Sequence, residues 1–144
     1  MAKILIVEDN ALNIKLFCDL LAAHGHEPEA VTDSRNALDA ARAFSPDLVI
    51  TDIQLPHVSG LELIRMLRAD EVLNTVPIMA VTAYSTSEDE ERIRAAGAQA
   101  YVSKPISVMR FVQEVDGLLR GPEETAEESP PIEQSKADPG SGPD

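Results

Sequence analysis

The chain has 144 residues and a formal net charge of −13 at pH 7, and its length favours one globular domain. Its 12 lysines and arginines face 25 acidic residues, which argues against nucleic-acid binding, because phosphates need clustered positive charge. A single cysteine excludes an internal disulfide, and no apolar stretch approaches the ~20 residues of a membrane-spanning helix. We therefore expect a cytoplasmic protein without membrane insertion.

Short apolar stretches alternate along the chain with amphipathic ones. We expect strands at residues 3–7, 26–31, 47–51, 77–81 and 99–102. We expect helices at residues 11–23, 33–44, 59–69, 87–96 and 107–119. Most of the strand candidates are continuous apolar runs, which are typical of parallel strands buried on both faces. Pro28 indicates an edge position for the second strand, because proline cannot donate a hydrogen bond to a neighbour.

The helices carry start and stop signals and apolar faces. Asn10 can cap the first helix, and Gly25 and Gly97 can end the first and fourth. The expected inner face of helix 11–23 consists of Leu12, Leu16, Phe17, Leu20 and Leu21. That of helix 107–119 consists of Val108, Phe111, Val112, Val115 and Leu119. Helix 87–96 is highly charged and has little apolar area beyond Ile93, so we expect it to be weakly anchored and able to move.

Alternating strands and helices predict an α/β protein with a parallel sheet and right-handed crossovers. We expect the flavodoxin-like (βα)5 arrangement, with strand order 2-1-3-4-5 and helices on both faces. This order places the first and third strands side by side. Their carboxyl ends then border the crevice where open α/β sheets bind ligands.

Polar residues follow four of the expected strands. Glu8 and Asp9 follow the first strand, Asp52 the third, Thr82 the fourth and Lys104 the fifth. If these strands are parallel neighbours, one edge of the sheet collects three carboxylates, a hydroxyl and an ammonium group.

Such a cluster suits phosphoryl transfer. Three adjacent carboxylates repel one another and need a counter-charge, and Mg²⁺ prefers oxygen ligands while keeping waters that a phosphate can displace. Lys104 and Thr82 can bind phosphoryl oxygens, whose charge must be neutralised during transfer. Asp52 is the natural nucleophile, because a carboxylate can form an aspartyl phosphate.

The same residues carry a resemblance to a known family. The acid pair Glu8-Asp9, the stretch Asp52-Ile53-Gln54-Leu55-Pro56 with Gly60, the triplet Val81-Thr82-Ala83 and the pair Lys104-Pro105 occur in order, each after its strand. Over residues 3–120 the chain resembles the receiver domain of two-component response regulators. Each motif alone is weak, but the ordered set is specific.

The resemblance implies a role for each site residue. Asp52 would accept phosphate from a sensor histidine kinase or a histidine phosphotransferase. Mg²⁺ would be held by Asp9, Asp52 and the backbone carbonyl of Gln54, with Glu8 acting through water. Thr82 and Tyr101 would form a switch pair.

The resemblance also implies features around the site. The Lys104–Pro105 peptide bond would be cis, and Tyr84 would shield the phosphoryl group from water. The surface formed by helix 87–96, strand 99–102 and helix 107–119 would bind a downstream protein. A single-domain regulator of this kind would signal through protein–protein contacts, in cell-cycle or developmental control.

Other interpretations remain open. An aspartate-nucleophile phosphatase of the haloacid dehalogenase type would need an acid two residues after Asp52, where this chain has Gln54. A receiver-like scaffold without phosphorylation would not need the intact set of acids and Lys104. Glu8 and Asp9 could instead cap the first helix, and Tyr101 could be ordinary edge packing.

The composition changes after residue 120. Residues 121–144 contain half of the ten prolines and seven acidic residues against one lysine. Such a segment cannot bury enough apolar surface to offset its ordering entropy. We therefore expect a receiver domain at 1–120 and a disordered acidic, proline-rich tail at 121–144, acting as a solubilising tail, a docking segment or part of a linker.

Overall fold

A five-stranded parallel sheet forms the centre of the molecule, for which the computed structural model describes residues 2–83 and 86–120. The elements are β1 (Lys3–Val7), α1 (Ala11–Ala23), β2 (Glu27–Val31), the 3₁₀ turn η1 (Ser34–Asn36), α2 (Ala37–Phe44), β3 (Leu48–Asp52), α3 (Gly60–Ala69), β4 (Ile78–Thr82), α4 (Ser87–Ala96), β5 (Ala100–Ser103) and α5 (Val108–Arg120). The strand order is β2-β1-β3-β4-β5, and every pairing is parallel. The predicted fold class and strand order are therefore confirmed.

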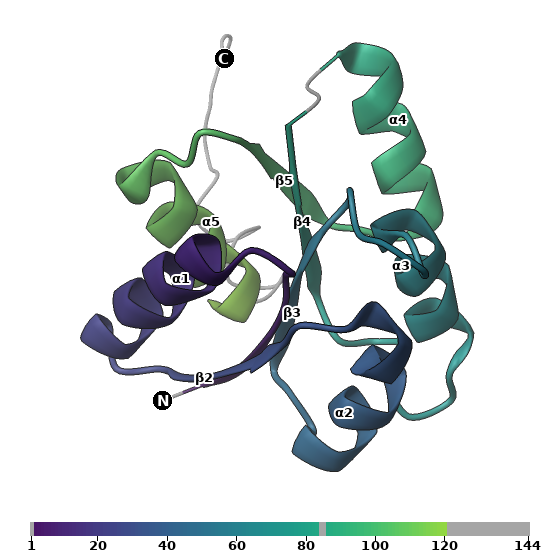
Figure 1. Ribbon diagram of the computed structural model, residues 1–144, viewed down its shortest axis with the longest axis horizontal. Helices are drawn as coiled ribbons and strands as arrows, with labels where there is room; N and C mark the ends of the chain where they lie inside the picture. Colours follow the sequence, from purple (N-terminus) through teal and green to yellow (C-terminus); the bar gives the residue numbers. More distant parts are fainter. Residues whose placement is uncertain (1, 84–85, 121–144) are drawn as a thin grey trace, which may run out of the picture.

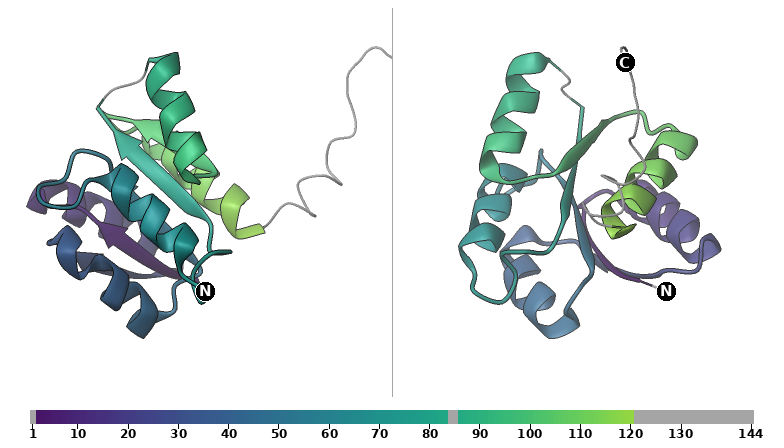
Figure 2. Two further views of the ribbon diagram at one scale, coloured as in Figure 1. Left: turned by 90° about the vertical axis from the view of Figure 1, so that its right-hand side faces the viewer. Right: turned by 180° about the vertical axis from the view of Figure 1, so that it is seen from behind.

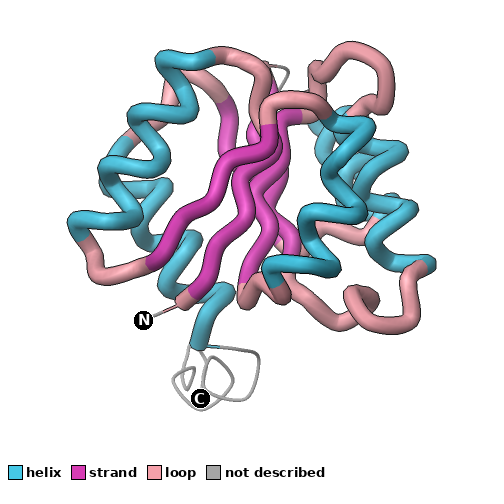
Figure 3. Tube along the Cα trace, turned by 60° about the horizontal axis from the view of Figure 1, so that its bottom comes forward, coloured by secondary structure: helices cyan, strands magenta, loops and turns pink. Residues whose placement is uncertain are grey.

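Helices cover both faces of the sheet. α1 and α5 lie on one face, and α2, α3 and α4 lie on the other (Figures 1 and 3). The view from behind shows the same two layers (Figure 2). α1 connects β1 to β2 in one direction across the sheet, whereas α2, α3 and α4 connect later strands in the other direction. Right-handed crossovers place these two sets of helices on opposite faces. α5 follows β5, the last strand of the described residues, and packs on the same face as α1 (Figure 1).

The strands supply two separate apolar cores, because successive side chains point to opposite faces of the sheet. Leu5, Val7 and Val49 pack beneath α2, α3 and α4. Ile4, Ile6 and Ile50 pack beneath α1 and α5. On that second face the rings of Phe17 and Phe111 stack with their centroids 5.1 Å apart and join α1 to α5. Every residue of β3 and β4 is buried, as predicted for central parallel strands.

Side-chain caps begin the helices near the sites predicted. Asn10 Oδ1 accepts a hydrogen bond from Asn13 N and caps α1. Ser59 and Glu62 form a reciprocal capping box at the start of α3. Thr86 caps α4 by accepting from Asp89 N. These contacts satisfy backbone N–H groups that the first helical turn leaves without partners.

The predicted inner faces of the first and last helices are only partly right. Phe17 and Leu21 of α1 are buried, but Leu12 is 79% exposed and Leu16 is 38% exposed. On α5, Phe111 and Val115 are buried, whereas Val108 at its first turn is 49% exposed. The apolar stripes of these helices therefore extend beyond the residues that pack in the core, and Leu12 and Val108 in their first turns are exposed.

Arg68 connects three segments at the edge of the sheet opposite the polar cluster. Its guanidinium donates to the backbone carbonyls of Gly97, Asn74 and Val76 at 2.9, 3.1 and 2.7 Å, and to Gln99 Oε1 at 2.7 Å. Gln99 Oε1 also accepts from the amide of Ile78, the first residue of β4. One side chain of α3 therefore fixes the loops that lead into β4 and β5.

Gly97 allows this connection to pack tightly. It ends α4 with a φ of +127°, and a Cβ at this position would lie 2.6 Å from Arg68 Cγ. A residue with a side chain would be strained here by both its backbone conformation and its contact with Arg68.

Two predictions concern residues that the structure does not describe, namely the tail at 121–144 and Tyr84. They stay predictions. Within the described ranges, no helix combines the length and the apolar character that crossing a bilayer requires.

Candidate functional site

The three predicted carboxylates meet at the carboxyl edge of the sheet. β1 and β3 are neighbours, with Val7 paired to Thr51, so the residues that follow these strands come level with each other. Glu8, Asp9 and Asp52 each offer a carboxylate oxygen within 4.8 Å of the others. Glu8 and Asp52 are only 1% and 3% exposed, while Asp9 is exposed.

Lys104 supplies the positive charge of this site. Its Nζ lies 2.9 Å from Asp52 Oδ2 and 3.7 Å from Glu8 Oε1. Its backbone N–H donates to the carbonyl of Thr82 at 2.8 Å, and this bond holds Lys104 next to the end of β4. The Lys104–Pro105 peptide bond is cis, as predicted. Two buried carboxylates therefore share one ammonium group, and the cluster retains excess negative charge.

Glu8 shows that a further positive charge would fit. Its Oε2 accepts from the Asn10 amide at 3.0 Å, but its buried Oε1 accepts no hydrogen bond from the described residues. Burial raises the pKa of Glu8 above its usual 4.5, and repulsion from Asp52 adds to the increase. This oxygen lies beside two more carboxylates, and the three groups together offer only oxygen ligands, which hard divalent cations prefer. The cluster is thus compatible with a divalent metal ion.

This raised pKa has a consequence for stability. Between pH 4.5 and the higher folded-state pKa, the folded protein binds more protons than the unfolded chain, so stability falls as pH rises. With a chelator present to keep the site free of metal, the free energy of unfolding of Glu8→Gln should rise relative to that of the parent protein as pH rises above 4.5. Urea unfolding followed by circular dichroism between pH 4 and 7 would measure the difference. Glu91→Gln, at an exposed glutamate of α4, is the control, and a Glu8→Gln difference that does not change with pH would contradict the expectation.

The loop after Asp52 is held close to the site by backbone contacts. Gln54, whose carbonyl is the fourth predicted ligand, donates its amide N–H to Asp52 Oδ1 at 3.1 Å. Gly60 at the start of α3 donates to the carbonyl of Ile53 at 3.0 Å. A Cβ on Gly60 would lie 2.6 Å from Ile53 Cα and closer still to the Asp52 carbonyl oxygen, so only glycine fits. The start of α3 therefore packs directly on the backbone of Asp52.

Ser34 is a positioning residue that sequence reasoning missed. This buried side chain of η1 donates to the carbonyl of Pro56 at 2.8 Å and accepts from the amide of Val58 at 3.2 Å. One hydroxyl therefore fixes the loop that carries Gln54. The sequence shows Ser34 only as a turn residue after β2, and nothing in its local pattern indicates a partner more than twenty residues away.

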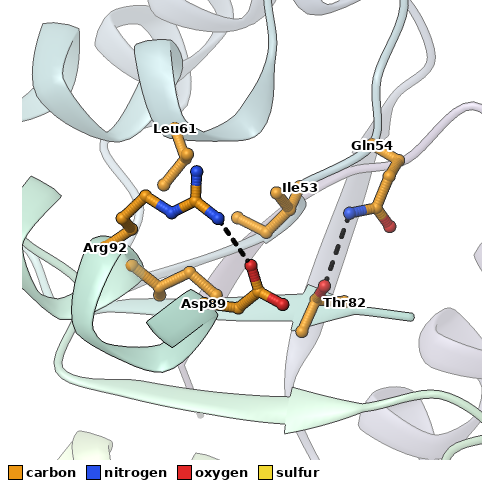
Figure 4. Close-up of a pocket in the computed structure, with 7 residues that line it drawn as sticks. Ile53, Gln54, Leu61, Thr82, Asp89 and Arg92 are labelled. Carbon is orange, nitrogen blue, oxygen red and sulfur yellow. Dashed lines mark hydrogen bonds and ion pairs between the residues drawn. The ribbon is translucent and has the colours of Figure 1, made fainter. Parts of the chain in front are cut away.

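Thr82 is buried at the end of β4 and borders a cavity of about 210 Å³. Gln54 Nε2 donates to Thr82 Oγ1 at 3.4 Å, and Gln54 Oε1 accepts from the amide of Ala83 at 3.3 Å. Figure 4 shows Gln54 turned toward Thr82 and Arg92 of α4 turned toward Asp89. The cavity is lined by Ile53, Gln54, Leu61, Thr82, Asp89, Arg92 and Ile93. There is thus open space between the predicted switch residue Thr82 and α4.

Tyr101, the other predicted switch residue, is directed toward α4. It lies on β5 two residues before Ser103, which is paired with Thr82. Its hydroxyl donates to Glu90 Oε1 at 3.2 Å. The structure therefore brings Glu8, Asp9, Asp52 and Lys104 into one cluster with Thr82 at its border, and it places Tyr101 against α4.

Comparisons with known proteins agree with this site. Residues 4–116 match the family model of the response regulator receiver domain. The chain is 52% identical over 116 residues to the polar-differentiation response regulator DivK of Brucella ovis, covering 81% of this chain and 94% of that protein.

Solved structures of similar proteins share the fold. The chemotaxis protein CheY4 of Vibrio cholerae has a TM-score of 0.78 and 26% identity, with 82% of this chain and 98% of that chain covered. The receiver domain of the sensor histidine kinase PA1611 from Pseudomonas aeruginosa, solved with a magnesium ion in its active-site cleft, has a TM-score of 0.77 and 29% identity, with 83% and 98% covered. The ordered motifs, the doubly wound sheet and the acidic edge thus have one explanation: the chain belongs to the family of response regulator receiver domains and is a signalling protein of the two-component type.

Proposed function

We propose that the chain accepts a phosphoryl group on Asp52 and passes the signal on through phosphorylation-dependent binding to another protein. The observation that carries this proposal is the contact between Lys104 Nζ and Asp52 Oδ2 inside a cluster of three carboxylates. This arrangement aligns a buried nucleophile with a fixed positive charge. It therefore combines the two elements that phosphoryl transfer needs, positioning and charge neutralisation.

In the transfer step, an oxygen of Asp52 attacks the phosphorus atom of a donor phosphohistidine. The new oxygen–phosphorus bond forms as the phosphorus–nitrogen bond breaks, and the donor imidazole leaves with its electron pair. Lys104 then binds one phosphoryl oxygen, and Thr82 hydrogen-bonds another from the end of β4. Asp9, Asp52 and the Gln54 carbonyl would hold magnesium, with Glu8 acting through water, and the bound ion would further neutralise the phosphoryl charge.

The donor has an apolar surface available next to the site. Leu12 and Leu16 of α1 are exposed, and so are Val108 and Met109 at the start of α5, with Met109 71% exposed. α1 and α5 share one face of the sheet, and α1 begins next to Asp9. We assign this surface to a sensor histidine kinase or histidine phosphotransferase, because the phosphohistidine must reach Asp52 from this edge.

The output surface lies on α4, β5 and α5. α4 has only two buried residues, Ile93 and Ala96, and can therefore shift at low cost. A downstream protein that binds this surface in the phosphorylated state would read the signal. The similarity to DivK, whose name refers to polar differentiation, supports a single-domain regulator in cell-cycle or developmental control in the cytoplasm.

Acetyl phosphate provides a direct test. Incubation with acetyl phosphate and Mg²⁺ should add one phosphoryl group by intact mass, and peptide mapping should place it on Asp52. A chelator should abolish the adduct, because the carboxylate cluster then lacks its counter-charge. If neither acetyl phosphate nor a phosphorylated histidine donor gives an adduct, the chain is a binding scaffold and the proposal is wrong.

A further inference from the structure

The hydroxyl of Tyr101 is held by a side chain of α4. Tyr101 is half-buried on β5, and its phenol donates to Glu90 Oε1 at 3.2 Å. Burial raises the pKa of Tyr101, and the hydrogen bond to Glu90 adds to this increase. The phenol therefore keeps its proton at neutral pH and remains a donor to the carboxylate.

Glu90 is itself fixed by Arg94 one turn later on the same helix. Arg94 Nε donates to Glu90 Oε2 at 3.0 Å, and its Nη1 donates to the carbonyl of Gln99 at 2.9 Å. Its guanidinium carbon lies 5.8 Å from the centroid of the Tyr101 ring, within range of a cation–π interaction. The two oxygens of Glu90 thus join Tyr101 to Arg94, and Arg94 joins α4 to the residue that precedes β5.

These polar contacts matter because α4 is otherwise weakly attached. Its only buried residues are Ile93 and Ala96. Asp89, Arg92 and Ile93 of this helix line the cavity that Thr82 borders (Figure 4). A helix with little apolar anchoring next to open space is free to move unless a few specific contacts hold it.

We propose that Glu90 is a positioning residue that holds Tyr101 against α4 and thereby favours the unphosphorylated conformation. The proposal rests on the proposed function, because it assumes that Tyr101 leaves this position when Asp52 is phosphorylated. The hydrogen bond then exists in one conformation and not in the other. Its free energy opposes phosphorylation by an amount that a single substitution can remove.

Glu90→Ala and Glu91→Ala form a matched pair for the test. The two glutamates are neighbours on α4, and both substitutions remove one negative charge from the same helix. Glu91 is exposed, however, and the hydroxyl of Tyr101 donates to Glu90. Glu90→Gln keeps an oxygen that can accept from the phenol and loses the charge that pairs with Arg94. Thermal unfolding of all three variants establishes that each is folded.

The first measurement is affinity for beryllium fluoride, a stable mimic of the phosphoryl group, in the presence of Mg²⁺. Glu90→Ala should bind it about two- to tenfold more tightly than the parent protein, as the loss of one net hydrogen bond from the competing conformation predicts. The affinity of Glu90→Gln should lie between those of the parent protein and Glu90→Ala, and the affinity of Glu91→Ala should equal that of the parent protein. Unchanged or weaker binding by Glu90→Ala would overturn the proposal.

The second measurement reports on Tyr101 directly. The chain has only two tyrosines, so fluorotyrosine labelling gives two ¹⁹F resonances, which Tyr84→Phe assigns. In the absence of any phosphoryl mimic, Glu90→Ala should move the Tyr101 resonance toward its position in the beryllium fluoride complex, and Glu91→Ala should not. A Tyr101 resonance that Glu90→Ala leaves in place would contradict the proposal.

The two failures are distinguishable. If the parent protein binds beryllium fluoride and takes phosphate on Asp52, while Glu90→Ala behaves like Glu91→Ala, only the role of Glu90 is wrong. If the parent protein neither binds beryllium fluoride nor accepts phosphate, the proposed function fails and the role of Glu90 fails with it.

Discussion

Asp52→Asn should reduce phosphoryl incorporation from acetyl phosphate below detection, while the protein stays folded. Asparagine has nearly the same shape as aspartate, but its amide is not a competent nucleophile and cannot form the acyl phosphate. The substitution also removes one of three mutually repelling carboxylates, so it should not lower stability through the cluster itself. Intact mass after incubation with Mg²⁺ and acetyl phosphate is the measurement.

Asp19→Asn is the control for this experiment. Asp19 is an exposed residue of α1 that pairs with Lys15 at 3.0 Å, away from the buried cluster. This variant should take up phosphate as the parent protein does. An adduct that persists in Asp52→Asn would assign the nucleophile to another residue, with Asp9 as the first to test.

Arg68→Ala should lower the free energy of unfolding by about 3–5 kcal/mol. This is the largest stability loss that we expect from replacing a partly buried side chain of this protein. The substitution removes four charge-assisted hydrogen bonds at once, to the carbonyls of Gly97, Asn74 and Val76 and to Gln99 Oε1. Arg68 is half-buried, and this burial lowers its pKa. Its partly desolvated charge therefore needs these acceptors. Urea unfolding followed by far-ultraviolet circular dichroism measures the loss.

Arg65→Ala is the matched control, because Arg65 lies on the same helix and is exposed. Its effect should stay within about 0.5 kcal/mol. The phosphorylation rate of folded Arg68→Ala should be close to that of the parent protein, since Arg68 lies at the opposite edge of the sheet from Asp52. A stability loss equal to that of Arg65→Ala would show that water replaces all four acceptor contacts.

The helices and strands could be predicted because local sequence patterns indicate them, and their alternation then predicted the topology. Apolar runs mark the strands, and residues such as Asn10 and Gly97 mark helix ends. The structure confirms these assignments to within one or two residues, apart from η1, which replaces the first turn of the expected second helix. The cluster of Glu8, Asp9, Asp52 and Lys104 was also predictable, because parallel strands bring their carboxyl ends to one edge.

Contacts made by long side chains could not be predicted in this way. Arg68, Glu90 and Arg94 act through atoms several bonds from the backbone, on partners set by tertiary placement. The exposure of Leu12 and Val108 was missed for a related reason. An apolar stripe on a helix shows which residues are alike in character, but tertiary packing decides which of them are covered.

The division of the apolar side chains into two cores has an evolutionary consequence. Leu5 and Val49 face the layer that carries α4, while Ile4 and Ile50 face the layer that carries α1. A duplicated gene could therefore change the side chains that pack beneath α2, α3 and α4 without changing those that pack beneath α1 and α5. The sheet separates substitutions in one core from those in the other. Diverging copies could therefore change one face while both keep the carboxylate cluster at the carboxyl ends of the strands.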